Sequence, residues 1–288
     1  MIRPVLQDDA FLADVAAIRA DLTSPRLFVW WLGQSGFLVC YRSEFLLFDP
    51  YLSDSLTKKY AATDKPHVRM TERVVDPARL DFVSAVTSSH NHTDHLDAET
   101  LGPLFAAAPA AKLVLPAANV AFVAQRLGPA AAARFVPLAD GQRATVGAFT
   151  FEAVPAAHEE LAPEFAGFVV SVGAFRLYHS GDTVRFPGMV ERLRPFGLDL
   201  ALLPINGRAP ERRVSGNLDG PEAARLAHAI GARWVVPCHY EMFAFNTASP
   251  LAFVAECGRL GQPHAVLRAG ARWSLAASAA DLSSIRKT

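Results

Sequence analysis

The chain has 288 residues, and its 28 Lys and Arg balance 28 Asp and Glu, so the formal net charge at pH 7 is zero. With 51% hydrophobic and 19% charged residues, the composition is that of a folded globular protein and excludes a largely disordered one. The balanced charge provides no general attraction to polyanions, so we expect neither a large nucleic acid nor a membrane as a partner.

The N-terminal segment and the cysteines predict the compartment. Residues 1–25 contain Asp8, Asp9 and Asp14 within an apolar stretch, which is typical of an amphipathic helix and not of a signal peptide. No stretch has the 18 or so apolar residues of a membrane span. The three cysteines are too few, and odd in number, for a disulfide framework. We therefore expect a soluble, cytoplasmic protein.

The first half of the chain reads as strands with helices between them. Alternating apolar and turn residues predict a hairpin early in the chain, and the next strand should end at His90. Asp97 is a candidate cap for one helix, and Gly128 ends another. Strands are expected at 27–33, 37–52, 81–90 and 111–116, and helices at 97–108 and 117–128.

The second half repeats this alternation. Strands are expected at 142–146, 149–156, 167–172, 175–180, 199–207 and 232–239. A helix over 220–232 has Pro221 in its first turn and Gly231 at its end. The tail, 276–288, lacks periodicity and is expected to be disordered. Because no repeat or linker marks a boundary, we expect one α/β domain over 1–288 with mixed sheets.

Residues 87–97, "TSSHNHTDHLD", hold three of the nine histidines of the chain. His90 and His92 are two positions apart, so they point the same way in extended backbone. Asp94 and His95 follow as the chain turns. Imidazole and carboxylate groups at the end of a buried strand are costly to desolvate, and coordination of a cation removes that cost. The spacing therefore favours a metal site over a solvated polar loop.

Three further candidate ligands each follow a predicted strand, namely His158, Asp182 and His239. Taken singly, they have other interpretations: a surface polar residue, a turn former and a buried structural histidine. Their shared position at strand ends favours metal ligands. Histidine and carboxylate ligands without a thiolate suit zinc, manganese or iron.

In this order, the ligand candidates resemble the five-motif pattern of the metallo-β-lactamase superfamily. Asp49, in "LLFDPYL", matches the aspartate that precedes the main motif in that superfamily. The phrases "WWLGQSGFLV", "FDPYLSDS", "LYHSGDT", "LPINGR" and "PCHYEMFAFN" are similar to the branch that includes L-ascorbate 6-phosphate lactonases, the UlaG-like proteins. The resemblance extends from about Trp30 to about Trp273.

The resemblance implies an α/β fold built as a four-layer αββα sandwich, with two mixed β-sheets face to face and helices on the outer faces. It also implies a binuclear centre at one edge, with His90, His92 and His158 on one divalent metal ion, Asp94, His95 and His239 on the other, and Asp182 bridging. Asp49 would accept a ring N–H from a ligand histidine. His179 either lies close behind the ligands or is a buried structural histidine.

The activity implied is hydrolysis of a small, anionic substrate. A hydroxide bridging two Zn²⁺ or Mn²⁺ ions, with iron as a further candidate, would attack a lactone carbonyl, that of a sugar-phosphate lactone included. Asp94 and Asp182 would act as ligands or proton acceptors, and Tyr240 or the second metal would stabilise the leaving alkoxide. Arg208, in a loop with Arg212 and Arg213, is a candidate anchor for the anion. Asn246 is a candidate substrate contact.

Other functions remain open. A two-metal centre equally suits hydrolysis of small cyclic or activated phosphodiesters. A di-iron redox protein and a metal-binding protein without catalysis are further alternatives. A homo-oligomer is expected because most soluble oligomers are assemblies of one chain.

Overall fold

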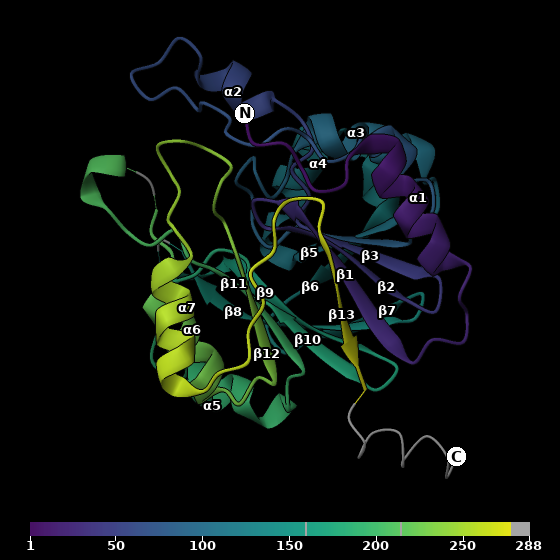
Figure 1. Cartoon of the computed structure of the whole chain (residues 1–288). Coiled ribbons are helices and arrows are strands. Elements are labelled where there is room, and N and C mark those ends of the chain that lie inside the picture. Colours follow the sequence, from purple (N-terminus) through teal and green to yellow (C-terminus); the bar gives the residue numbers. More distant parts are fainter. Residues whose placement is uncertain (159, 214, 278–288) are drawn as a thin grey trace.

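Two mixed β-sheets form the centre of the molecule (Figure 1), and the computed structural model describes residues 1–158, 160–213 and 215–277. The strands of the first sheet are β1 (Arg26–Gly33), β2 (Gly36–Tyr41), β3 (Glu44–Phe48), β4 (Ala85–Thr87), β5 (Lys112–Pro116), β6 (Phe135–Leu138) and β13 (Arg272–Ala276). Those of the second are β7 (Arg143–Val146), β8 (Phe149–Ala157), β9 (Leu161–Val172), β10 (Phe175–His179), β11 (Leu200–Pro204) and β12 (Trp234–Cys238).

The strand order explains where the loops meet. The first sheet runs β13-β1-β2-β3-β4-β5-β6 and the second β12-β11-β10-β9-β8-β7. From β3 to β6 the pairing is parallel, and so is the pairing among β10, β11 and β12. Strand β8 also runs parallel to β10, since both are antiparallel to β9. The carboxyl ends of β8, β10 and β12 therefore lie at one edge of the second sheet.

The core lies between the two sheets. Every residue of β2 and β11 is buried, as expected for strands covered on both faces. Phe37 and Phe48 of the first sheet belong to the same buried cluster as Phe151 and Phe168 of the second. Each such side chain contributes about 1.5–3 kcal/mol on burial, so this layer holds the sheets together.

Helices cover the outer faces. In Figure 1, α1 (Asp8–Arg19), α3 (Ala98–Ala107) and α4 (Val120–Leu127) lie beside the first sheet, and α5 (Met189–Leu193), α6 (Gly220–Ala229) and α7 (Leu251–Leu260) beside the second. Short α2 (Ser55–Tyr60) lies in an excursion beyond the sheets. Short 3₁₀ helices occupy Pro77–Arg79, Ala117–Asn119, Pro129–Arg134, Arg194–Phe196 and Pro210–Arg212. Within the described residues, none of the helices is both long and apolar enough to cross a bilayer.

Much of the predicted fold is confirmed, including the α/β class, the two mixed sheets and the outer helices. Asp97 caps α3 by accepting the Glu99 N–H. Asp219 caps α6 in a reciprocal arrangement with Glu222, which fixes the start of that helix.

Several predicted boundaries are wrong. The strand expected over 81–90 is only β4, because the chain turns after Thr87 to present its polar residues. The hairpin predicted early in the chain is present, because β1 and β2 pair antiparallel, but the stretch 37–52 is divided into the two strands β2 and β3. The strand predicted at 167 begins six positions earlier, at Leu161. Strand β13 ends at Ala276. Residues 278–288, which are most of the tail predicted to be disordered, lie outside the described residues.

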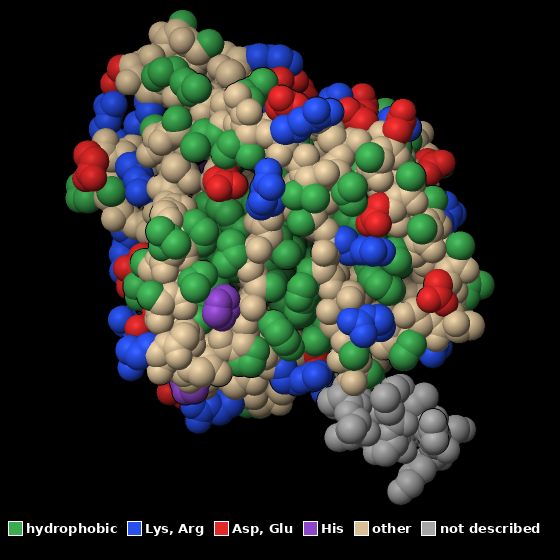
Figure 2. Space-filling view, viewed as in Figure 1, with side chains coloured by type: hydrophobic (Ala, Val, Ile, Leu, Met, Phe, Trp, Pro, Cys, Tyr) green, Lys and Arg blue, Asp and Glu red, His purple; other side chains and the backbone are tan. Residues whose placement is uncertain are grey.

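The surface agrees with the balanced composition. Figure 2 shows Lys and Arg side chains interspersed with Asp and Glu over this face of the molecule. Many are paired, for example Lys58 with Glu99 and Arg192 with Asp140. Exposed pairs of this kind contribute about 0–1 kcal/mol each, so they affect solubility more than stability.

Candidate metal centre

All seven predicted metal ligands come together at one edge of the two sheets. The loop after β4 provides four of them, and the segments after β8, β10 and β12 provide one each. They are His90, His92, Asp94, His95, His158, Asp182 and His239. The centre is thus assembled from both sheets.

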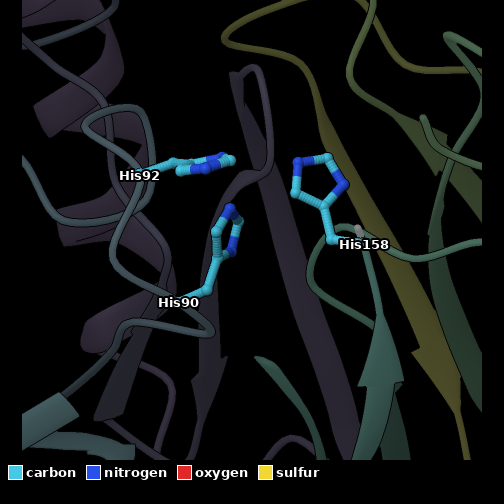
Figure 3. A group of neighbouring side chains, drawn as sticks. All are labelled: His90, His92 and His158. Atoms are coloured by element: carbon cyan, nitrogen blue, oxygen red, sulfur yellow. The ribbon is translucent and has the colours of Figure 1, made fainter. Parts of the chain in front are cut away.

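A first group consists of three imidazoles. Figure 3 shows His90 and His92 directed toward His158, which comes from the opposite sheet. Their donor nitrogens lie within 4.8 Å of one another. The Nδ1 of His158 donates to the main-chain oxygen of Gly216 at 3.0 Å, and this leaves Nε2 free of a proton and directed into the centre.

A second group consists of Asp94, His95 and His239. The Oδ2 of Asp94 lies 3.7 Å from Nε2 of His95 and 3.6 Å from Nε2 of His239. Donor atoms with this spacing can share one cation at bond lengths of about 2.0–2.2 Å.

Asp182 lies between the two groups. Its Oδ1 is 3.3 Å from Nε2 of His95, and its Oδ2 is 3.1 Å from Nε2 of His239 and 3.7 Å from Nε2 of His158. A single carboxylate that approaches ligands of both groups has the position of a bridging ligand.

Unpaired donor atoms show that these residues fit divalent cations. The Nε2 atoms of His90 and His95 and the Oδ1 of Asp182 are buried, and none has a hydrogen-bond partner among the described residues. Leaving such atoms buried and unpaired costs free energy, and a cation bound to their lone pairs removes that cost.

Asp49 supports the ligands from behind. Its fully buried carboxylate accepts the Nδ1–H of His95 at 2.8 Å and the hydroxyl of Thr87 at 2.6 Å. Burial alone would raise the pKa of Asp49, but the neighbouring His179 and His95 outweigh burial and the pKa is lowered. The Asp49 carboxylate therefore holds His95 in the tautomer that presents Nε2 to a metal.

His179 lies close enough to Asp49 to lower the pKa of that carboxyl, and it is held by contacts outside the two donor groups. Its Nε2 donates to the main-chain oxygen of Ser35 at 3.0 Å, and its ring stacks on Phe48 at 4.8 Å. With none of its surface exposed, His179 matches the buried structural alternative.

Electrostatics distinguish the two groups in the absence of a cation. Burial lowers the pKa of His90 and of His158, so both are neutral at pH 7. Burial also opposes protonation of His239, but Asp182 and Asp94 outweigh it and raise the pKa of His239 to about 9. The same carboxylates raise the pKa of His95 well above its usual value. The second group therefore holds protons that a metal must displace.

A cavity of about 520 Å³ opens above the donor atoms. Its size suits a small molecule. Cations at its rim come from Lys59, Arg126 and Arg213, whereas its acidic lining residues are the ligands Asp94 and Asp182. One wall is apolar and aromatic, formed by Leu56, Tyr60, His67, Phe243 and Phe245.

Two predicted substrate residues are placed differently. Arg208 is not among the cavity-lining residues, because its guanidinium binds the Glu222 carboxylate, with Nη1 to Oε2 at 3.0 Å, and the Asn217 carbonyl at 3.1 Å. Arg213, from the same loop, lines the cavity in its place. Asn246 does line the cavity, and its Oδ1 accepts an N–H of Asn206 at 3.0 Å.

The structure does not bring Tyr240 to the centre. Its ring stacks on Trp31 at 4.3 Å and its hydroxyl donates to the main-chain oxygen of Leu267. His239 follows the end of β12 with a left-handed φ of 63°, and the side chain of Tyr240 after it is buried in the core. The predicted role of Tyr240 in stabilising a leaving alkoxide therefore has no support in this geometry.

Gln34, which the sequence interpretation missed, contacts two ligands of the second group. Its Nε2 donates to Oδ2 of Asp94 at 2.7 Å and lies 3.0 Å from Nε2 of His239. Its main-chain oxygen accepts the His239 N–H at 2.9 Å. Gln34 lies in the β1–β2 turn with a left-handed φ of 51°. The glycines on either side, in "GQSG", were the available signal of a tight turn.

Comparisons with known proteins show what the chain is similar to. Residues 45–240 match the family model of the beta-lactamase superfamily domain. A UPF0173 metal-dependent hydrolase of Opitutus terrae is 30% identical over 252 residues, which are 83% of this chain and 96% of that protein.

Two solved structures share the fold. A possible metal-dependent hydrolase of Veillonella parvula superimposes with a TM-score of 0.70 at 15% identity, over 86% of this chain and 99% of that one. CmlA, a diiron beta-hydroxylase from Streptomyces venezuelae, gives a TM-score of 0.65 at 16% identity, over 87% of this chain and 54% of that one. At these identities the likeness extends to the fold alone.

Proposed function

The chain belongs to the metallo-β-lactamase superfamily and to its metal-dependent hydrolases, and from this premise we propose that it hydrolyses a small anionic ester, a lactone first of all. The observation that carries the proposal is the pair of donor groups on either side of the Asp182 carboxylate. The phrases similar to the L-ascorbate 6-phosphate lactonases, "WWLGQSGFLV" among them, support a lactone as the substrate.

His90, His92 and His158 would hold one divalent cation, and Asp94, His95 and His239 a second, with Asp182 shared. Zn²⁺ or Mn²⁺, with iron as a third candidate, would supply Lewis acidity and hydroxide near neutral pH. The protein fixes the donors beforehand, since Asp49 holds the tautomer of His95. The imidazoles around Asp94 and Asp182 keep the pKa of both carboxyls low despite burial, so both are ionised as ligands or proton acceptors.

The rim cations support an anionic substrate. Arg126 is tied to the ligand loop, where its Nη1 donates to the carbonyls of Asn91 at 2.8 Å and Leu96 at 3.0 Å. Arg213 pairs with Asp64 at 2.8 Å, and both side chains are largely exposed. An exposed pair is worth about 0–1 kcal/mol, so a substrate carboxylate or phosphate can replace Asp64 at little cost.

A small phosphodiester is the second candidate. The same three rim cations that suit a carboxylate also suit a phosphate, and two metals can stabilise both the attacking and the leaving oxygens of a phosphorus centre. The described residues of the cavity walls suit both electrophiles, so the two substrates belong in one experiment.

The test is metal analysis followed by reconstitution. We expect about two equivalents of metal per chain, loss of activity on chelation, and recovery with Zn²⁺, Mn²⁺ or Fe²⁺, assayed on γ-butyrolactone and on bis(4-nitrophenyl) phosphate. Arg143→Ala, on the outer β7–β8 hairpin, is the control that should change neither metal content nor activity. Failure to recruit any metal on titration would overturn the proposal, and reversible redox colour with stoichiometric iron would favour an oxidative function instead.

A further inference from the structure

We propose that the aromatic wall of the cavity is a subsite for an apolar, preferably aryl, group of the substrate. The aromatic wall is defined as Tyr60, His67, Phe243 and Phe245 with Leu56. This inference rests on the proposed hydrolase function, and it adds that the substrate is an amphipathic anion instead of a uniformly polar sugar derivative.

The rings of the wall are packed against one another. Tyr60 stacks on His67 at 4.2 Å with an interplanar angle of 17°. His67 in turn meets the rings of Phe245 at 4.5 Å and Phe243 at 5.1 Å, both edge to face. Rings fixed in this way present a rigid apolar surface, which a flat group can cover with little loss of side-chain entropy.

The wall belongs to a hydrophobic cluster that is separate from the core between the sheets. Tyr51, Leu56, Met242 and Phe243 form this small cluster, and Tyr60 and Phe245 pack on it half-buried. Its segments are tied by main-chain hydrogen bonds, Met70 N to Met242 O at 2.8 Å and Ala244 N to Val68 O at 3.0 Å. Of the aromatic wall, Leu56 and Phe243 are buried, whereas Tyr60, His67 and Phe245 are half-buried and present ring surface to the cavity.

The charges around the wall fit an apolar group with an anion beside it. Burial lowers the pKa of His67, so the stack is uncharged at pH 7. Lys59 lies over the Tyr60 ring at 5.1 Å, and Lys65 lies over the Phe245 ring at 5.8 Å. A substrate with its apolar group on the wall can direct an anionic group to Arg126 or Arg213 and its carbonyl to the donor atoms.

The reaction balances without another reactant. Water adds to the lactone carbonyl carbon, the ring C–O bond to that carbon breaks, and the departing oxygen takes a proton from the water. The product is an open hydroxy acid that carries the same apolar group. Its ionisation releases the second proton of the water and leaves a carboxylate where the carbonyl was, at the donor atoms.

The experiment separates binding from turnover. Binding of 4-phenylbutanoate and butanoate to the zinc-loaded protein is measured by calorimetry, and hydrolysis of γ-phenyl-γ-butyrolactone is compared with that of γ-butyrolactone. We expect the phenyl compounds to bind and react about tenfold better. Phe245→Ala and Tyr60→Ala should each remove most of that preference by lowering the affinity for the phenyl compounds. The affinity for butanoate should stay the same in both variants. Phe135→Ala, a half-buried aromatic on β6 outside the cavity, is the matched control.

The outcomes distinguish this inference from the hydrolase proposal. Equal binding of both carboxylates, with no effect of either wall variant, overturns the subsite even if γ-butyrolactone is hydrolysed. Selective binding of 4-phenylbutanoate that depends on Phe245, without hydrolysis of any ester, supports the subsite and removes the proposed function. Circular dichroism and metal content confirm that each variant is folded, and the two wall variants provide independent tests.

Discussion

Asp182 is the residue on which both donor groups depend, because its two oxygens face His95 and His239 in one group and His158 in the other. Substitution Asp182→Ala should lower turnover by at least about a hundredfold and reduce the metal content below two equivalents. Elemental analysis and circular dichroism should show a folded protein that has lost metal. Asp140→Ala, an exposed carboxylate paired with Arg192, is the control. Full activity with two bound metals in Asp182→Ala would remove the bridging role.

Gln34 contacts Asp94 and His239, which both belong to the second donor group, so its substitution should affect metal binding at that group alone. Gln34→Ala removes the hydrogen bond to Asp94 and leaves the main-chain contact to His239. We expect the affinity for the second metal equivalent to fall about 10–100-fold, with the first unchanged. Stepwise calorimetric titration of the metal-free protein measures both. Gln125→Ala, an exposed position on α4, should behave as the unmodified protein. Equal loss at both steps would mean that Gln34 acts on the whole centre.

The pKa shifts predict that the two metals differ in proton release. His90 and His158 are already neutral at pH 7, whereas the raised pKa values of His95 and His239, the latter about 9, keep both protonated. Metal binding needs neutral imidazole, so affinity at the second group should rise with pH up to about 9 and decline below it. Calorimetry at pH 7 in buffers of different ionisation enthalpy should show protons released with the second equivalent. Proton-free binding at both steps would contradict this assignment.

At the scale of elements, the turn after β10 packs tightly on the turn after β4. Gly181 has a φ of 59°, and a Cβ there would lie 2.5 Å from the Cβ of Ser89. Ser89 hydrogen-bonds Asp49, so a displacement would be transmitted to His95. Gly181→Ala should therefore lower the free energy of unfolding by about 1–3 kcal/mol and weaken metal binding.

Urea denaturation measures this effect, and α7 provides a control of opposite sign. Gly258 lies in that helix, and a Cβ added there would meet no atom of another part of the molecule within 4 Å. Gly258→Ala should therefore stabilise the protein by about 0.5–1 kcal/mol. If Gly181→Ala were as stable as the unmodified chain, the two turns would be less tightly coupled than their contact indicates.

The sequence predicted which donor side chains come together, because imidazole and carboxylate groups at strand ends are a local signal. It could not predict where neighbouring side chains point. The position of the Arg208 guanidinium depends on its pairing with Glu222. The direction of the Tyr240 side chain depends on the left-handed φ of 63° at His239. The early start of β9 was hidden by Pro163, a residue that argues against a strand.

The aromatic wall was missed for a different reason. Tyr60 lies on a short helix, and His67 and Phe245 lie in loops, so no periodic pattern marks them as neighbours. Their proximity results from tertiary contacts between segments about 180 positions apart in the chain, as the bridge between Arg69 and Phe243 illustrates.

At the scale of the whole molecule, the donor groups connect the two sheets, because His158, Asp182 and His239 come from one and the remaining ligands from the other. Bound metal should therefore stabilise the sandwich as a whole. With metal at a thousandfold excess over Kd, the gain is about 4 kcal/mol, which corresponds to a rise in Tm on the order of 10 °C. Calorimetric scans of chelated and reloaded protein measure it, with chelator and equimolar zinc together as the control. Identical Tm values would mean that the sheets are joined by their core alone.

The dispersal of the ligands along the chain has a consequence for biosynthesis. A ribosome delivers the chain from its N-terminus, and domains begin to fold as they emerge. His90 and His92 leave first and His158 follows, so the first group is complete while β12 is still unmade. The second group waits for His239, which arrives with one of the last strands. Translation thus delivers the donor residues of the first group before those of the second, and any metal binding by the complete second group has to follow the synthesis of β12.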